Sequence, residues 1–222
     1  MTALCTLGGD PVVDLQLFLP RVGVWHADVT VDGQAELTGK QTLTLDGVNL
    51  VGTVRRGGIS SDVGAYRVVG GGGGFLKLAT PKGYNGVPAS IVVQDLLTGA
   101  GEQLSSTVEP SLLNTLLPSW VTVRRTTAAA LADLLVALGD DVTWRMLPDG
   151  TVWFGRESWP VQSPDVLNIS AIDTRLGRFR AGLANGSMVY PGTCFESAGT
   201  RVSYVAVSTR DASRLEAEVW TE

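Results

Sequence analysis

Hydrophobic and polar residues alternate with a period of two over the first third of the chain. Residues 14–19 and 25–32 place an apolar side chain at every second position, a pattern typical of antiparallel strands that bury one face. Shorter segments of the same kind predict further strands at residues 43–45, 48–54, 66–69 and 75–78. The Asp-Gly pairs at 32–33 and 46–47 favour tight hairpin turns, because they supply positive φ angles. Six or so short strands predict a small barrel or sandwich.

The spacing becomes helical in the middle of the chain. Pro88 and Gly99 enclose one predicted helix, because proline favours the first turn and glycine the end. Thr126 and Thr127 precede a second helix, with leucines at i, i+3, i+4 and i+7 that predict a core-facing stripe (Leu131, Leu134, Leu135 and Leu138). A further helical turn is predicted between Pro110 and Leu117.

Strand patterns return after the second helix. Residues 142–146 and 151–154 flank a Pro-Asp-Gly turn and predict a hairpin. After Trp159, strands are expected at residues 166–169, 188–190, 201–208 and 214–220. The predicted fold class is therefore mainly β with an α+β insertion. Its expected domains are a first β block over residues 1–84, a helix–helix–hairpin segment over 85–160 and a second β block over 161–222.

Composition and charge narrow the function classes. The chain has 222 residues, of which 44% are hydrophobic and 18% charged, and this composition is globular. Its net charge of -5 argues against a duplex-binding surface, which needs an excess of basic residues. The acidic surplus lies in residues 85–160. No apolar run is long enough to cross a bilayer, and the N-terminus lacks the basic region of a secretory signal.

The rarer reactive side chains do not gather in the sequence. Cys5, Cys194 and the single histidine, His26, cannot assemble a zinc site within one chain. We expect the two thiols to be unpaired and buried, and His26 to be a surface strand residue rather than a base. No Gly-x-Ser-x-Gly motif occurs, so the corresponding class of hydrolases is not supported.

Other motifs have simple structural interpretations. The five glycines at 70–74 could cradle a phosphate, but no helix is expected to follow, so a tight turn where backbone approaches backbone is preferred. The arginines and paired acids are expected to be solvated, and the two Asn-x-Ser motifs to be chance matches; these residues are Arg55, Arg56, Arg124, Arg125, Arg175, Arg178, Arg180, Asp28, Asp32, Asp140, Asp141, Asn168 and Asn185. We therefore predict no catalytic residue, no cofactor-binding residue and no metal ligand.

Several segments, taken in order, resemble one known family. They are residues 19–28 (LPRVGVWHAD), 52–58 (GTVRRGG), 66–75 (YRVVGGGGGF), 84–102, 144–153 (WRMLPDGTVW), 189–193 (VYPGT) and 201–205 (RVSYV). Together they resemble the baseplate hub proteins of bacteriophage tails, the late control protein D group. That group is related to the hub half of type VI secretion spike proteins.

The resemblance implies two β-barrel tube domains that flank a small α+β segment. It implies a homotrimer whose six barrels form a pseudo-sixfold ring, with no enzymatic activity and no cofactor. The implied partners are the tail tube or a distal tail protein, a central spike or tip protein and the tape measure protein. Genome DNA would pass through without sequence recognition. The implied location is the virion tail, assembled in the host cytoplasm. About sixty residues follow Trp159, barely enough for a second barrel, so any spike is expected to be a separate chain.

Two alternatives stay open at the level of sequence. A tail-associated cell-wall hydrolase would place two carboxylates on either side of a glycosidic bond. A carbohydrate-binding β module would expose its tryptophans as a stacking platform. Peptidoglycan turnover that is lost in an acid-to-amide variant would favour the first, and tryptophan quenching by a host polysaccharide would favour the second.

Overall fold

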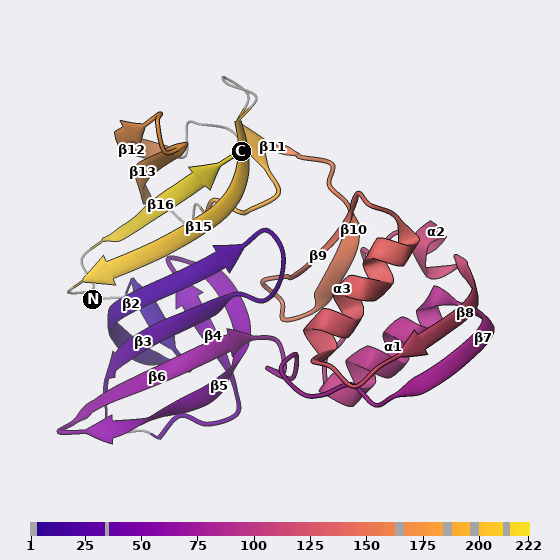
Figure 1. Ribbon diagram of the computed structural model, residues 1–222. Coiled ribbons are helices and arrows are strands. Elements are labelled where there is room, and N and C mark those ends of the chain that lie inside the picture. The colour runs from indigo at the N-terminus through magenta and orange to yellow at the C-terminus, as the bar shows by residue number, and fades with distance from the viewer. Residues whose placement is uncertain (1–3, 34–35, 163–166, 184–187, 196–199, 211–213) are drawn as a thin grey trace.

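The computed structural model describes residues 4–33, 36–162, 167–183, 188–195, 200–210 and 214–222. The strands from the two ends of the chain lie together on one side, and the helices lie beside them with two pairs of short strands (Figure 1). The mainly β fold with an α+β insertion is confirmed.

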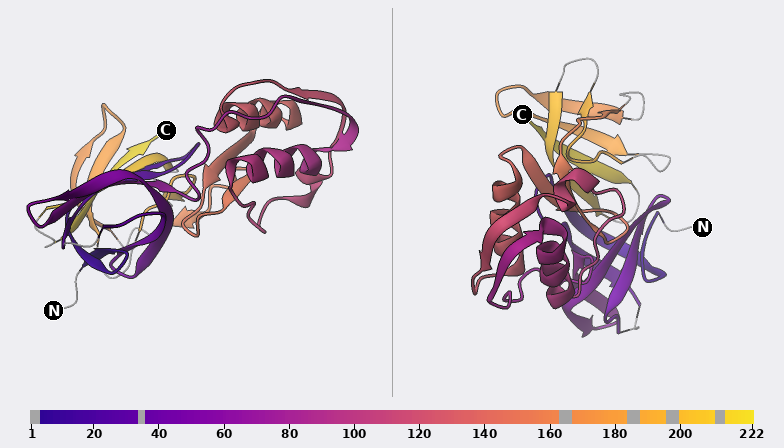
Figure 2. Two further views of the ribbon diagram at one scale, coloured as in Figure 1. Left: turned by 90° about the horizontal axis from the view of Figure 1, so that it is seen from below. Right: turned by 90° about the vertical axis from the view of Figure 1, so that its right-hand side faces the viewer.

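The first β unit is a closed barrel of six antiparallel strands. They are β1 (Cys5–Leu7), β2 (Asp10–Pro20), β3 (His26–Asp32), β4 (Lys40–Leu45), β5 (Val48–Ser60) and β6 (Val63–Gly70). The strand order is β1-β4-β5-β6-β3-β2, and pairing between β1 and β2 closes the circle. Figure 2 shows this barrel end-on in its left view. The alternating side chains fill the interior, where Leu15 and Leu17 are completely buried.

Turn chemistry explains which of the expected barrel elements formed. The Asp46-Gly47 pair makes a hairpin between β4 and β5, with φ angles of 44° and 89°. The prediction of a hairpin at Asp32-Gly33 is wrong. Strand β3 pairs with β2 and β6, and the chain crosses from β3 to β4 without pairing the two strands. The strand expected at residues 75–78 is also wrong. There the Lys77 N–H donates to the Gly74 carbonyl in a turn, and the Phe75 ring stacks on Trp144.

The middle unit combines helices with one hairpin, β9–β10, and one pair of strands, β7 and β8, that are separated in the chain by α1 and α2. Its elements are β7 (Lys82–Pro88), α1 (Ala89–Ala100), α2 (Pro110–Leu113), β8 (Leu116–Thr122), α3 (Thr127–Leu138), β9 (Val142–Met146) and β10 (Val152–Arg156). The helix after Pro88 runs through Gly99 and ends at Gly101, whose φ of 79° provides the left-handed cap. Helix α3 begins where expected, because the Thr126 hydroxyl accepts the N–H of Ala129. The hydrophobic pattern did not predict the β7–β8 pair.

The second β unit is a sheet that continues the barrel. Its strands are β11 (Val161–Gln162), β12 (Leu167–Asp173), β13 (Arg178–Leu183), β14 (Cys194–Phe195), β15 (Thr200–Arg210) and β16 (Leu215–Thr221), in the order β11-β14-β15-β16-β13-β12. No ladder between described residues joins β11 to β12, so their hydrogen bonds leave this sheet open. Residues 188–190, expected as a strand, are irregular, whereas β13 was not foreseen.

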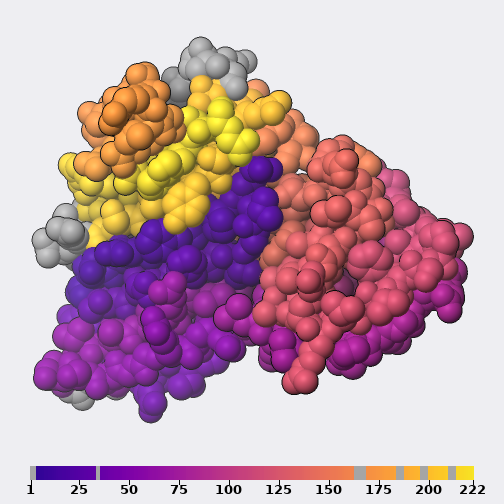
Figure 3. Space-filling model, viewed as in Figure 1, coloured from indigo at the N-terminus to yellow at the C-terminus, as the bar shows by residue number. Residues whose placement is uncertain are grey.

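One ladder fuses the two β units. Strand β2 pairs with β15 from Pro20 opposite Tyr204 to Asp14 opposite Arg210, so the barrel and the second sheet form a single twelve-stranded sheet. The space-filling view shows the two units packed without interruption, with the middle unit against their side (Figure 3).

Candidate functional site at the junction of the three units

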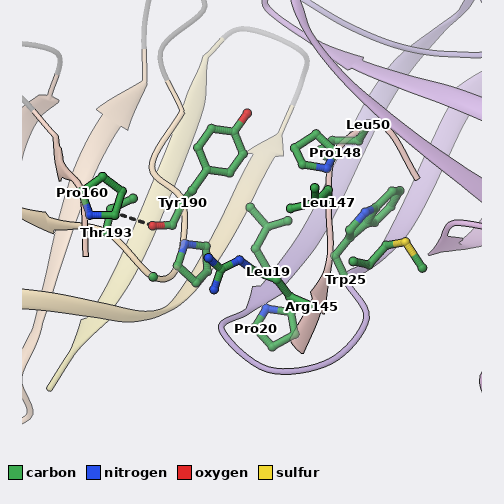
Figure 4. A pocket seen from close by; sticks show the side chains of 13 residues that line it. Leu19, Pro20, Trp25, Leu50, Arg145, Leu147, Pro148, Pro160, Tyr190 and Thr193 are labelled. Atoms are coloured by element: carbon green, nitrogen blue, oxygen red, sulfur yellow. Dashed lines mark hydrogen bonds between the residues drawn. The ribbon is translucent and has the colours of Figure 1, made fainter. Parts of the chain in front are cut away.

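An apolar pocket lies where the barrel, the β9–β10 hairpin and the second β unit meet. It encloses about 370 Å³. All three units contribute to its wall (Figure 4), which consists of Leu19, Pro20, Trp25, Leu50, Arg145, Met146, Leu147, Pro148, Pro160, Tyr190, Pro191, Gly192 and Thr193. The pocket therefore exists only when the three units are assembled.

Backbone hydrogen bonds dock the hairpin onto the barrel. The Gly23 N–H donates to the Trp144 carbonyl at 2.9 Å, and the Met146 N–H donates back to the Gly23 carbonyl at 2.8 Å. The Val51 N–H donates to the Pro148 carbonyl at 2.7 Å. These bonds position the turn at Pro148 beside the barrel and hold it at the pocket wall.

Arg145 ties the hairpin to the linker toward the second unit. Its guanidinium donates two hydrogen bonds to the Glu157 carboxylate, at 2.5 and 3.1 Å. It also lies 4.4 Å from the centre of the Trp153 ring, a cation–π distance. Gly192 has a φ of 85°, which favours glycine, and a Cβ there would lie 2.6 Å from Arg145 Nη1 and displace the guanidinium.

The pocket can bind apolar groups but carries no reactive centre in its described wall. Its one charged group, Arg145, is already paired, and no carboxylate, histidine, cysteine or serine lines it. The Thr193 hydroxyl donates to the Tyr190 carbonyl at 2.7 Å (Figure 4) and is satisfied internally. An apolar wall whose polar groups are paired internally suits a packing contact between the three units.

The glycine-rich loop holds an internal carboxylate. The N–H groups of Gly72 and Gly74 donate to the two Glu102 carboxylate oxygens, at 2.8 and 2.7 Å. Glu102 is only 6% exposed. A Cβ at Gly74 would lie 1.8 Å from the Ala100 carbonyl oxygen, so this glycine permits the approach of backbone to backbone that was expected. The role of Glu102 was missed, because one acid after a helix carries no distinctive sequence signal.

His26 stacks on the Phe18 ring with centroids 5.0 Å apart. Burial lowers the pKa of His26, the nearby positive charge of Arg67 lowers it further, and Asp28 opposes both effects. Asp28 is itself paired with Arg67 at 3.0 Å. His26 therefore lies in a row of half-buried aromatic side chains that crosses the β2–β15 ladder, together with Phe18, Tyr204 and Trp220.

The paired acids noted in the sequence do not converge on a common site. Asp141 pairs with Arg156 at 2.9 Å, on the loop before β9. Asp28 and Asp32 both lie along β3, four residues apart, and Asp140 is exposed beside Asp141.

The arginines that were noted lie in three separate places. Arg178 donates to Glu218 at 2.7 Å on the outer face of the second unit. Arg125 pairs with Asp133 on α3. Arg55 and Arg56 are exposed on β5, Arg124 is exposed after β8, and Arg175 and Arg180 are exposed around β13. They do not form one basic cluster.

Both cysteines are free thiols. Burial raises the pKa of Cys5 to about 12, and the Cys194 thiol donates to the Trp159 carbonyl. Of the two Asn-x-Ser motifs, Asn185 lies outside the described residues, and Asn168 lies on β12.

The tryptophans do not form an open platform. Trp25 and Trp144 are buried. Arg145 covers Trp153, and Arg21 and Arg201 lie 5.7 and 4.8 Å from the centre of the Trp159 ring.

Within the described part of the chain, no three His, Cys, Asp or Glu side chains are grouped to hold a metal ion. None of the helices there is long and apolar enough to span a membrane.

No protein-family model matches this chain, and no curated protein matches it.

Solved structures share its fold over nearly the whole length. A tail protein of prophage MuSo2 from Shewanella oneidensis aligns with a TM-score of 0.66 at 11% identity, over 98% of this chain and 97% of that one. A tail protein from Neisseria meningitidis aligns with a TM-score of 0.66 at 12% identity, over 100% and 97%. The Escherichia coli c3393 protein, a component of the type VI secretion system, aligns with a TM-score of 0.65 at 13% identity, over 98% and 76%.

These alignments confirm the resemblance at the level of the fold. The chain has the fold of phage tail proteins and of type VI secretion components. Because all three identities are low, the likeness shows the architecture and not the activity.

Proposed function

We propose that this protein is a structural hub of a phage tail baseplate or tail tip. In this proposal three copies form a ring in which six β units are related by a pseudo-sixfold axis. The ring joins the tail tube or a distal tail protein to a central spike or tip, near the tape measure protein. The protein resides in the virion tail, and DNA passes through without sequence recognition.

The observation that carries the proposal is the match of fold along the whole chain to tail proteins. The fused sheet supports it, because the β2–β15 ladder already places two β units side by side within one chain. Two such units in each of three copies would supply six positions around an axis. We propose that the domains of this protein are residues 1–84, 85–160 and 161–222, and the meeting of three units at the junction pocket supports this division.

We also propose that the protein is not an enzyme. The described wall of the junction pocket has no carboxylate, histidine, cysteine or serine, and the similar structures are tail and secretion components. The covered tryptophans give no support to a carbohydrate platform.

The oligomeric state tests the hub proposal. Native mass spectrometry at micromolar concentration should show a trimer of the purified protein, alone or with its tail neighbours, and negative-stain images should show rings. A monomer throughout the concentration range, with no ring in micrographs of the tail, would contradict the proposal. Unchanged peptidoglycan after incubation with the protein would agree with a non-enzymatic role, whereas turnover would refute it.

A further inference from the structure

The junction pocket stays open between side chains that pack closely elsewhere in the chain. The described residues of its wall leave about 370 Å³ between them, whereas protein interiors have few voids larger than a water molecule. Trp25 and Leu50 form the buried part of this wall, with 1% and 0% of their surface exposed. The volume is near the lower end of the range for ligand pockets, so it suits one large side chain better than an extended ligand.

Prolines and backbone hydrogen bonds make the wall of the pocket rigid. Four of its thirteen residues are prolines, whose rings fix the φ angle: Pro20, Pro148, Pro160 and Pro191. The Pro148 carbonyl accepts the Val51 N–H at 2.7 Å, and the Gly192 N–H donates to the Val202 carbonyl at 2.9 Å. A pocket that is already formed requires little ordering when a group enters it.

Exposed apolar side chains lie beside the wall of the pocket. Val22, two residues after the wall residue Pro20, is 47% exposed, and Val161, directly after Pro160, is 55% exposed. In protein interfaces, one anchor side chain is buried in a pocket and the contacts around it exclude water. This apolar margin therefore favours a protein partner over a free small molecule.

Three arginines lie in the wall or directly beside it. Arg145 belongs to the wall, and Arg21 follows the wall residue Pro20. Arg201 lies on β15 opposite the residue that follows the wall residue Thr193. We call these three arginines the rim of the pocket.

One arginine of the rim has no carboxylate partner among the described residues. Arg145 is paired within the chain, and Arg21 pairs with Glu222 at 3.2 Å. Arg201 instead lies against the Trp159 ring, with its guanidinium carbon 4.8 Å from the ring centre. The rim therefore keeps a positive charge, although the net charge of the chain is -5. Interfaces bring together surfaces of opposite charge, so the rim favours an acidic partner segment.

We infer that the junction pocket receives one large apolar side chain from a partner protein, and that Asp or Glu residues of the same segment pair with Arg201. The entering side chain contacts Trp25 and Leu50, and the residues beside it cover Val22 and Val161. This inference extends the proposed function, because the partner is then a neighbour of this protein in the tail.

Binding of short peptides tests this inference. The probe is a fluorescein-labelled Glu-Asp-Phe-Asp-Glu peptide with an amidated C-terminus, and fluorescence polarisation should show saturable binding to the purified protein. Replacing Phe by Ala in the peptide should weaken binding by about tenfold or more, because the anchor carries most of the binding energy. A Lys-Lys-Phe-Lys-Lys peptide should bind more weakly than the acidic probe, because its charges repel the rim.

Variants of the protein locate the binding site. Arg201→Gln should weaken binding of the acidic probe by about two- to fivefold, the effect of losing one exposed ion pair. The matched control Arg180→Gln removes an exposed arginine of β13 outside the wall and should leave binding unchanged. Leu147→Trp adds bulk to a half-buried wall residue and should abolish binding. Circular dichroism of each variant verifies that its fold is retained.

Several results would overturn the inference. They are a lack of binding by the unmodified protein, equal binding of the Phe and Ala peptides, and equal losses in Arg201→Gln and Arg180→Gln. Conversion of a native oligomer into monomers by excess acidic probe would show that the occupant is a second copy of this chain, not a partner protein. Peptide binding by a protein that stays monomeric in native mass spectrometry would support the pocket and overturn the proposed ring. A trimer that does not bind the probe would do the reverse.

Discussion

At the residue scale, Glu102 connects the glycine-rich loop to the end of α1. Its carboxylate accepts the N–H groups of Gly72 and Gly74, and Gly101 immediately before it caps the helix. A buried carboxylate is stable only when its oxygens are hydrogen-bonded. The loop therefore depends on this one acid.

We predict that Glu102→Gln lowers the free energy of unfolding by about 1.5 to 3 kcal/mol, the usual range for hydrogen bonds to a charged group. The amide keeps one acceptor oxygen but directs an NH₂ group toward a backbone N–H. Urea denaturation measures the change. The control is Glu109→Gln at an exposed acid 3.6 Å from Arg156, where a change below about 1 kcal/mol is expected. Equal losses in both variants would argue against the special role of Glu102.

The lowered pKa of His26 should make the stability of the protein depend on pH. Its pKa is lowered from the ordinary value of 6.5, so the folded protein binds fewer protons than the unfolded chain. The contribution of neutral His26 to the free energy of unfolding is therefore fully present above the pKa of the unfolded state. It is lost as the pH falls from that pKa toward the lower pKa of the folded state. We expect a lower thermal midpoint at pH 5.5 than at pH 7.5. The variant His26→Gln should lose this dependence, and a persistent slope in the variant would assign it to other groups.

At the element scale, the helices follow their end signals closely. The Thr126 hydroxyl accepts the Ala129 N–H at 3.3 Å and begins α3. We predict that Thr126→Ala costs about 0.5 to 2 kcal/mol of stability, because the first turn loses its cap. Thr126→Ser, which keeps the hydroxyl, should cost much less. Thermal unfolding of the two variants provides the comparison, and equal losses would rule out capping as the cause.

Helix α1 shows which of two glycines is the cap. Gly99 is helical, and a Cβ there would meet nothing within 4 Å, whereas Gly101 adopts a φ of 79°. Gly99→Ala should therefore raise the free energy of unfolding by about 0.5 to 1 kcal/mol. Gly101→Ala should lower it, because alanine is strained in the left-handed region. Denaturant titration of the pair distinguishes the two positions, and a gain at Gly101 would contradict this assignment.

At the scale of the whole molecule, Arg145 and Glu157 hold the three units together. The side chain of Glu157 is only 7% exposed. Glu157→Gln removes the negative charge and leaves the largely buried guanidinium without its counter-ion, which should cost about 1 to 3 kcal/mol. It should also increase protease cleavage near residues 157–160, because the linker would detach more often. The control Arg214→Gln disrupts an exposed ion pair with Glu216 and should leave both readouts nearly unchanged.

The local elements whose signals span only a few residues could be predicted from the amino-acid sequence. Period-two alternation indicated strands β2, β3, β15 and β16, and the caps Pro88 and Thr126 indicated α1 and α3. The Asp46-Gly47 hairpin was foreseen for the same reason, since its positive φ angles are set by two adjacent residues. The mainly β class with an α+β insertion follows from these elements alone.

The way in which those elements are joined could not be predicted, because it depends on contacts between distant parts of the chain. The β2–β15 ladder and the contact of Arg145 with Glu157 link residues distant in the chain. Alternation indicates which face of a strand is buried. It does not indicate the partner strand, because the backbone hydrogen bonds at a strand edge can be made by any strand of suitable length. Long-range pairing depends on the packing of the whole core, so the junction pocket is visible only in the folded molecule.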